Sequence, residues 1–102
     1  MYFASLVDII HQFSFTNKGP IIMLQIENEY GWYGTDKSYM QAIRSLWKDL
    51  NVTDIPEYYV DWFENIEKCH WEGANIGINN GIVENQWVKT REMEPKGYLL
   101  GG

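Results

Sequence analysis

The sequence predicts an α/β fold built on a parallel β-sheet with helices packed against it. Short β-type runs alternate with segments whose apolar residues recur at helical spacing. The intervening stretches leave room for helical crossovers, and no tight Asn-Gly hairpin lies between the runs at 58–62 and 74–79. Nothing repeats at a fixed period. This alternation is typical of a parallel sheet whose strands are joined through helices.

The first half of the chain is predicted to contain a helix, a strand and a second helix. Residues 2–15 carry apolar side chains at helical spacing, and the Asn, Gly and Pro that follow end this helix. Residues 21–27 form a β-type run of mostly aliphatic residues. Residues 36–50 carry an apolar stripe at positions i, i+3, i+4 and i+7, and Thr35 or Asp36 is placed to cap the helix.

The second half is predicted to contain three strands and one further helix. The strands are expected at 58–62, 74–79 and 98–100. Asn80-Gly81 is predicted to form the turn after the second of them. Residues 83–94 indicate a charged helix that Pro95 ends. Residues 63–73 favour a loop with a helical turn.

Composition and charge limit the possible functions. The chain has 102 residues, enough for one domain with a modest core, and 45% of them are hydrophobic. A formal net charge of −6 argues against a nucleic-acid partner, which needs a basic footprint, and against docking on an anionic membrane. No apolar run approaches the length of a membrane span. One cysteine and two widely spaced histidines argue against an internal disulfide and a zinc site.

Two carboxylates bracket an asparagine where the first predicted strand ends, in the order Glu27-Asn28-Glu29. In a regular strand Ile22, Leu24 and Ile26 would share one face, and Gln25, Glu27 and Glu29 would share the other. Parallel α/β proteins place their chemistry at the carboxyl ends of the strands. Glu29 is therefore the first candidate for a functional side chain.

A carboxyl group beside an amide donor and aromatic side chains is what glycoside cleavage needs. One acid protonates the leaving oxygen, and a second carboxylate stabilises or captures the sugar cation. The aromatic share of 16% suits stacking on sugar rings, although most of these rings are expected to fill the core.

The stretch Gly19-Pro20-Ile21-Ile22-Met23-Leu24-Gln25-Ile26-Glu27-Asn28-Glu29-Tyr30-Gly31 resembles a long motif of glycoside hydrolase family 35, the retaining β-galactosidases. In that family the motif ends the fourth strand of the catalytic barrel. Residues 59–62, 75–81 and 94–102 resemble the fifth strand, the sixth strand and the approach to the seventh. The resemblance implies a partial (β/α)8 TIM barrel, about strands 4 to 7 with the intervening helices. Residues 1–102 would be one fragment of a single catalytic barrel.

The resemblance assigns roles to two residues. Glu29 matches the general acid/base, and Asn28 matches the residue that hydrogen-bonds the sugar 2-OH. The family's nucleophile is a glutamate at the end of the seventh strand, and it is expected beyond Gly102 because no glutamate follows Leu100. Glu27 is expected to meet polar neighbours inside the barrel. Two carboxylates suffice for double displacement on a terminal β-galactoside, so no metal and no organic cofactor is implied.

Four further residues are candidates for contact with the sugar: Tyr30, Asp61, Trp62 and Asn79. Tyr30 could wall the sugar site or pack its own loop. Asp61 and Trp62 end the fifth strand, where substrate contact and a structural role are equally expected of Asp61. Asn79 ends the sixth strand and could reach sugar hydroxyls.

A second function remains open, a non-catalytic carbohydrate-binding or interaction protein derived from a truncated barrel. A reading frame that continues past Gly102 into a glutamate and an aromatic run would favour the enzyme. An unrelated α/β enzyme that shares Asn-Glu by chance is disfavoured by the length of the first motif. The expected partner is a carbohydrate substrate, a β-galactoside, and open sheet edges predict self-association of the fragment.

Overall fold

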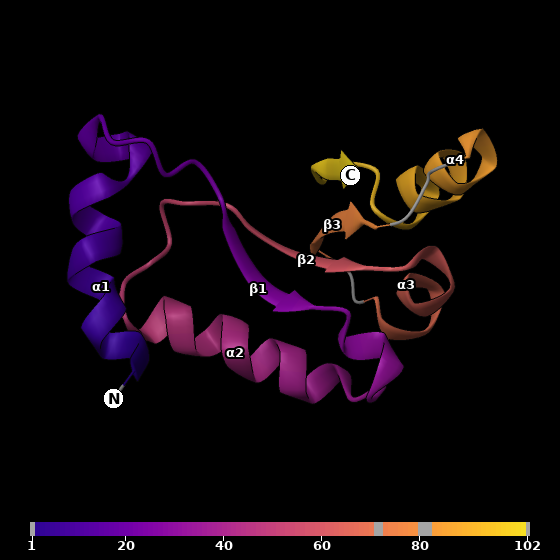
Figure 1. Cartoon of the computed structure of the whole chain (residues 1–102), viewed down its shortest axis with the longest axis horizontal. Helices are drawn as coiled ribbons and strands as arrows, with labels where there is room; N and C mark the ends of the chain where they lie inside the picture. Colours follow the sequence, from indigo (N-terminus) through magenta and orange to yellow (C-terminus); the bar gives the residue numbers. More distant parts are fainter. Residues whose placement is uncertain (1, 71–72, 80–82, 102) are drawn as a thin grey trace.

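The computed structural model describes residues 2–70, 73–79 and 83–101, and helices alternate with strands along it (Figure 1). The α-helices are α1 (Tyr2–Phe13), α2 (Lys37–Asp49), α3 (Phe63–Cys69) and α4 (Glu84–Met93). The strands are β1 (Leu24–Asn28), β2 (Glu57–Asp61), β3 (Asn75–Ile78) and β4 (Leu99–Gly101). Two 3-10 helices are η1 (Phe15–Asn17) and η2 (Tyr30–Trp32).

The four strands form one parallel sheet in the order β1-β2-β3-β4. An α-helix between consecutive strands returns the chain to the same end of the sheet, which allows each strand to run parallel to the one before it. The predicted α/β class with a parallel sheet is therefore confirmed. β1 and β4 are the outer strands of the sheet that the described residues form.

The first helix and the first strand are shorter than predicted. α1 ends at Phe13, and β1 begins at Leu24. Between them, Ser14 is buried and forms an isolated parallel bridge with Ile21. The Ile21 N–H donates to the Phe13 carbonyl oxygen at 2.9 Å. This turn uses backbone groups that a longer helix or a longer strand would have used.

A regular helix, α3, occupies most of the segment that was predicted to be a loop with a helical turn. Its residues Asn65, Ile66 and Cys69 are buried. A helix of seven residues is too short to be stable by itself. The burial of these three side chains against the rest of the molecule therefore stabilises α3. The predicted turn at Asn80-Gly81 lies outside the described residues.

β1 contains a β-bulge at Ile26. Gln25 pairs with Tyr58 and Glu27 pairs with Tyr59, so Ile26 is an extra residue between two successive pairs. One extra residue shifts the alternation of side chains by one place. The prediction that Gln25 and Glu27 share a face of a regular strand is therefore wrong.

Glu27 lies on the side of the sheet that α2 covers. Its Oε2 accepts a hydrogen bond from the Tyr39 hydroxyl of α2, and this bond raises the pKa of Tyr39 to about 12. Glu27 does meet a polar neighbour, as expected, but because of the bulge at Ile26 this neighbour belongs to α2 and does not lie inside a barrel. On the other face, Gln25 Nε2 donates to Asn28 Oδ1 at 3.1 Å.

The core lies between the sheet and the helices and consists of two clusters. The first joins β2 and β3 to α2 and α3 through Met40, Tyr59, Ile66, Ala74, Ile76 and Ile78. The second joins α1 to α2 and the loop after it through Ile10, Trp47, Val52 and Ile55. Removing a fully buried aliphatic side chain costs roughly 2–5 kcal/mol of stability. The helices thus cover one face of the sheet, and the other face carries polar side chains such as Gln25 and Asn28 beside apolar ones such as Val60 and Leu100.

A buried polar cluster connects β2 to the segment after α3 and to the end of α4. The Tyr59 hydroxyl lies 3.1 Å from His70 Nδ1, and His70 Nε2 lies 3.8 Å from Glu94 Oε1. Glu94 also accepts a hydrogen bond from the Gly73 N–H. Burial raises the pKa of Tyr59. Burial lowers the pKa of His70, an effect that Lys37 reinforces and Glu94 opposes.

This cluster predicts a loss of stability in mild acid. Because the pKa of His70 is lower in the folded chain than the usual 6.5, the unfolded chain binds the proton more readily. The stability that depends on neutral His70 is therefore fully present above about pH 6.5, and it is lost progressively as the pH drops below that value. We expect the thermal midpoint of a complete protein that carries these residues to fall less between about pH 8 and pH 5 after His70→Gln. An unchanged pH dependence in this variant would contradict the assignment.

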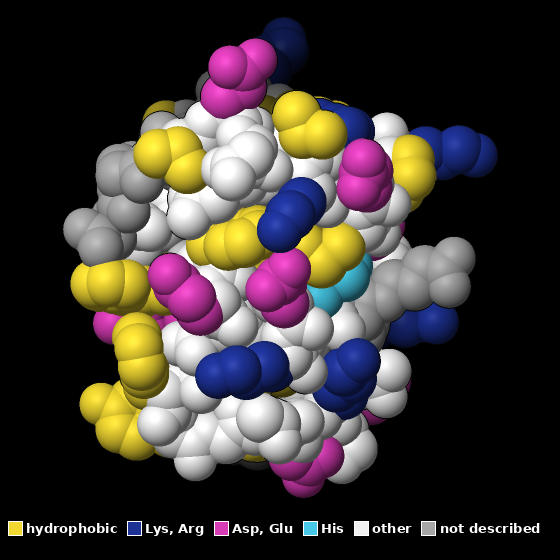
Figure 2. Space-filling view, turned by 90° about the vertical axis from the view of Figure 1, so that its right-hand side faces the viewer, with side chains coloured by type: hydrophobic (Ala, Val, Ile, Leu, Met, Phe, Trp, Pro, Cys, Tyr) yellow, Lys and Arg dark blue, Asp and Glu magenta, His cyan; other side chains and the backbone are white. Residues whose placement is uncertain are grey.

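The surface of α3 and α4 carries charges of both signs. Acidic and basic side chains lie interspersed with hydrophobic ones on this face (Figure 2). No helix among the described residues is long and apolar enough to cross a membrane. Within the same residues, no group of three or more His, Cys, Asp or Glu side chains is arranged to hold a metal ion.

Candidate active site

Glu29 lies where β1 ends and the chain turns into η2. Its backbone is left-handed, with φ 56° and ψ 32°. A glutamate in this conformation costs on the order of 1–3 kcal/mol, a strain that is frequent at functional sites. Two hydrogen bonds hold the residue in place: its N–H donates to the Val60 carbonyl oxygen at 2.7 Å, and its own carbonyl oxygen accepts from the Trp32 N–H at 3.2 Å.

Hydrogen bonds to the side-chain carboxyl group of Glu29 connect the C-terminal ends of three strands. Its Oε1 accepts a hydrogen bond from Trp62 Nε1 at 3.1 Å, just after β2. The same oxygen accepts from Asn79 Nδ2 at 2.9 Å, just after β3. The parallel sheet brings these residues together because parallel strands end at the same edge. The sequence predicted this common edge, and the structure confirms it.

Asp61 is a buried support of the site, with 1% of its surface exposed. Its Oδ2 accepts from the Gly31 N–H at 2.7 Å. Its Oδ1 accepts from the Trp62 N–H at 2.8 Å and from Asn65 Nδ2 at 2.9 Å. These bonds connect η2, the end of β2 and α3. They favour the structural role that was considered beside substrate contact.

Gly31 allows η2 to lie directly against α3. A Cβ atom at this position would lie 2.4 Å from the Cβ of Asn65 and 2.8 Å from Asp61 Oδ2. Both distances are shorter than real contacts, so any side chain here would push η2 away from the Asp61 carboxylate. Close packing against Asn65 and Asp61 therefore explains why a glycine follows Tyr30 in the motif.

Asn28 belongs to a row of polar groups on the face of the sheet that the helices leave uncovered. The Tyr58 hydroxyl donates to Gln25 Oε1 at 3.3 Å, and Gln25 Nε2 donates to Asn28 Oδ1 at 3.1 Å. Because the Asn28 oxygen accepts from Gln25, its Nδ2 group is left to donate to another acceptor. In β3, Gly77 makes room for this face, since a Cβ atom there would lie 2.8 Å from Val60 Cγ2.

Aromatic rings surround the turn after Glu29. The Trp32 and Trp62 rings meet edge to face with centroids 5.7 Å apart, and Trp32 is 56% exposed. The Tyr30 ring packs on Tyr39 of α2 at 4.6 Å, and its hydroxyl accepts from the Asp36 N–H at 3.3 Å. The contacts of Tyr30 favour packing of its own loop, whereas the tryptophan pair lies beside the carboxyl group.

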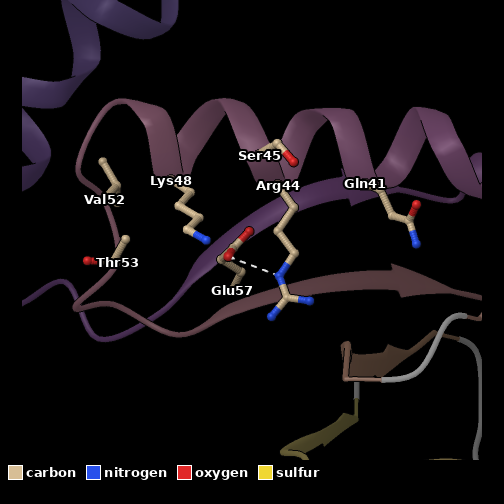
Figure 3. Close-up of a pocket in the computed structure, with 7 residues that line it drawn as sticks. All are labelled: Gln41, Arg44, Ser45, Lys48, Val52, Thr53 and Glu57. Atoms are coloured by element: carbon tan, nitrogen blue, oxygen red, sulfur yellow. Dashed lines mark hydrogen bonds and ion pairs between the residues drawn. The ribbon is translucent and has the colours of Figure 1, made fainter.

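A separate pocket of about 520 Å³ lies between α2, the loop after it and the start of β2 (Figure 3). It is lined by Gln41, Arg44, Ser45, Lys48, Val52, Thr53 and Glu57. Arg44 Nε lies 3.4 Å from Glu57 Oε1 across it. Burial raises the pKa of Glu57, an effect that Arg44 opposes. Since Glu57 begins β2 and Trp62 follows its end, this pocket lies at the edge of the sheet opposite to Glu29.

The family model for glycosyl hydrolases family 35 matches residues 1–97. The chain belongs to this family. The resemblance that the motif around Glu29 indicated is therefore confirmed.

Curated relatives of this family 35 chain are named as β-galactosidases. Beta-galactosidase 1 of Dictyostelium discoideum is 51% identical over 45 residues, which cover 44% of the chain and 7% of the relative. Beta-galactosidase 17 of Arabidopsis thaliana is 47% identical over 47 residues, 46% of the chain and 7% of the relative. Beta-galactosidase-1-like protein 3 of Rattus norvegicus is 30% identical over 94 residues, 91% of the chain and 15% of the relative. The chain thus spans a small part of the length of the relatives it matches.

The family 35 chain connects four of its six predicted site residues by hydrogen bonds: the Glu29 carboxyl group accepts from the side chains of Trp62 and Asn79, and Asp61 accepts from the backbone N–H groups of the same two residues. The other two, Asn28 and Tyr30, lie around them with partners of their own. Sequence reasoning missed Gln25 and Tyr58, which contact Asn28 directly or through each other. The alternation of side chains along β2 could have identified Tyr58, because it points to the same face as Val60 and as Trp62 just after the strand.

Proposed function

We propose that residues 1–102 form the segment of strands 4 to 7 in the barrel of a retaining β-galactosidase. Such an enzyme cleaves terminal β-galactosides by double displacement. Family membership and the names of the relatives support this proposal. The observation that carries it is the Glu29 carboxyl group, fixed at the carboxyl edge of a parallel sheet by Trp62 and Asn79.

In the proposed mechanism, Glu29 acts twice. As a general acid it protonates the glycosidic oxygen while the aglycone leaves, and as a general base it then takes a proton from the incoming water. Asn28 donates from its Nδ2 group to the sugar 2-OH, an orientation that the bond from Gln25 supports. The edge-to-face rings of Trp32 and Trp62 provide an apolar wall for the sugar.

The nucleophile is proposed to come from outside residues 1–102. Double displacement needs a second carboxylate about 5 Å from the first. Glu27 is bound to Tyr39 on the helix side of the sheet, and Asp61 is buried beneath η2 with both oxygens accepting hydrogen bonds. Neither carboxylate is placed to attack a sugar beside Glu29.

The stereochemistry of the product tests this proposal. We expect a complete protein that contains residues 1–102 to hydrolyse an aryl β-galactoside and to release β-galactose first, as proton NMR of the early product would show. Retention follows from two successive inversions at the anomeric carbon. Release of α-galactose would contradict double displacement. Binding of galactosides without hydrolysis would favour the alternative of a non-catalytic carbohydrate-binding protein.

A further inference from the structure

Both hydrogen bonds that the Glu29 carboxyl group receives from Trp62 and Asn79 end on the same oxygen. Trp62 Nε1 lies 3.1 Å from Oε1, and Asn79 Nδ2 lies 2.9 Å from the same atom. An indole N–H and an amide NH2 group can only donate. A proton on Oε1 would point at one of these donors and would break its hydrogen bond. Oε1 is therefore the oxygen of this carboxyl group that stays unprotonated.

Asp61 anchors the backbone of the two residues that carry these donors. The Asp61 carboxylate accepts from the Trp62 N–H at 2.8 Å, and the Asp61 carbonyl oxygen accepts from the Asn79 N–H at 2.9 Å. Asp61 is 1% exposed, so these bonds are shielded from water. Both donors therefore extend from anchored backbone positions, and rotation of the carboxyl group away from them would cost both bonds to Oε1 at once.

We propose that Trp62 and Asn79 are positioning residues that hold Glu29 by Oε1 and so confine the catalytic proton to Oε2. This inference rests on the proposed role of Glu29 as the acid/base. In the first step the nucleophile carboxylate from outside residues 1–102 bonds to the anomeric carbon, the bond from that carbon to the glycosidic oxygen breaks, and the proton passes from Oε2 to this oxygen. In the second step the water oxygen bonds to the anomeric carbon, the bond from that carbon to the nucleophile carboxylate breaks, and Oε2 takes the proton that the water releases. Oε1 keeps its two donors throughout, so the acid returns to its starting state.

The substitutions Trp62→Phe and Asn79→Leu test the inference. Each removes one donor to Oε1, while phenylalanine keeps an aromatic ring at position 62 and leucine keeps the branched shape of the asparagine side chain. In a complete protein that carries residues 1–102, we expect the double variant to lose roughly 10²-fold in kcat/KM on an alkyl β-galactoside, the size of the effect of a misplaced catalytic group. A dinitrophenyl β-galactoside should lose far less, because its leaving group departs without a proton. Trp87→Phe on α4, which removes an indole N–H away from the site, is the matched control.

The dependence on the leaving group separates positioning from other roles. An equal loss on both substrates would mean that the two residues hold the sugar or the fold, and it would overturn the inference. Unchanged kinetics would overturn it as well. If either single variant is unstable, the other one gives the same comparison. The proposed function fails by a different result, in which Glu29→Gln keeps its activity on the alkyl substrate.

Discussion

Replacing Glu29 by glutamine is expected to slow the hydrolysis of an ordinary alkyl β-galactoside by roughly 10²–10⁴-fold, the usual contribution of general acid–base catalysis. Glutamine keeps the shape of the side chain, and its amide oxygen can still accept from Trp62 and Asn79. It cannot release a proton to the glycosidic oxygen. Activated aryl galactosides should lose less in the first step, because their leaving groups need little protonation. Steady-state and burst kinetics on both substrates measure the difference in a complete protein that contains this chain.

Glu27→Gln is the matched control for this experiment. It removes a carboxylate two residues earlier in the same motif, but Glu27 is bound to Tyr39 of α2 rather than facing the site. We expect it to leave kcat within a few-fold of the original, as surface substitutions usually do. Near-normal turnover by Glu29→Gln, or an equal loss in the two variants, would contradict the assignment of the acid to Glu29.

Residues 1–102 by themselves are expected to show no β-galactosidase activity and to self-associate. The sheet of the described residues has two outer strands, β1 and β4, whose backbone groups are free to pair with another chain. Apolar side chains accompany both, since Ile22 just before β1 is 66% exposed and Tyr98 just before β4 is 59% exposed. Surfaces of this kind bury themselves against a partner.

Light scattering and an aryl β-galactoside assay check this prediction directly. The sample should elute as large species and should not turn over substrate, while the complete protein does so under the same conditions. A stable monomer whose activity disappears with Glu29→Gln would show that a nucleophile exists among these residues. The proposed origin of the nucleophile outside the chain would then be wrong.

The sequence alone predicted the arrangement of the sheet and the meeting of its strand ends. Helical crossovers between β-type runs require parallel strands, and parallel strands bring their ends together, so the meeting of Glu29 and Asn79 followed from topology. The motif at 19–31 then indicated the family that the comparison confirms. These predictions succeeded because they depend on the order of elements and not on their exact bounds.

The details of side-chain direction could not be predicted in the same way. The bulge at Ile26 depends on how β1 pairs with β2, which no local pattern in residues 21–27 encodes. The helix α3 is stabilised by burial of Asn65 and Ile66 rather than by its own propensity. The contact of Trp62 with Glu29 requires the turn at η2, which the buried Asp61 carboxylate holds in place.

The extra residue in β1 matters to anyone who would graft this site onto a new scaffold. An ideal designed strand has no bulge. In such a strand the copied Glu-Asn-Glu triplet would direct its first glutamate to the face that the helices leave uncovered and its asparagine to the face that the helices cover. A graft would therefore have to copy the bulge at Ile26 and its pairing with β2 together with Asn28 and Glu29, because the bulge sets the direction of both side chains.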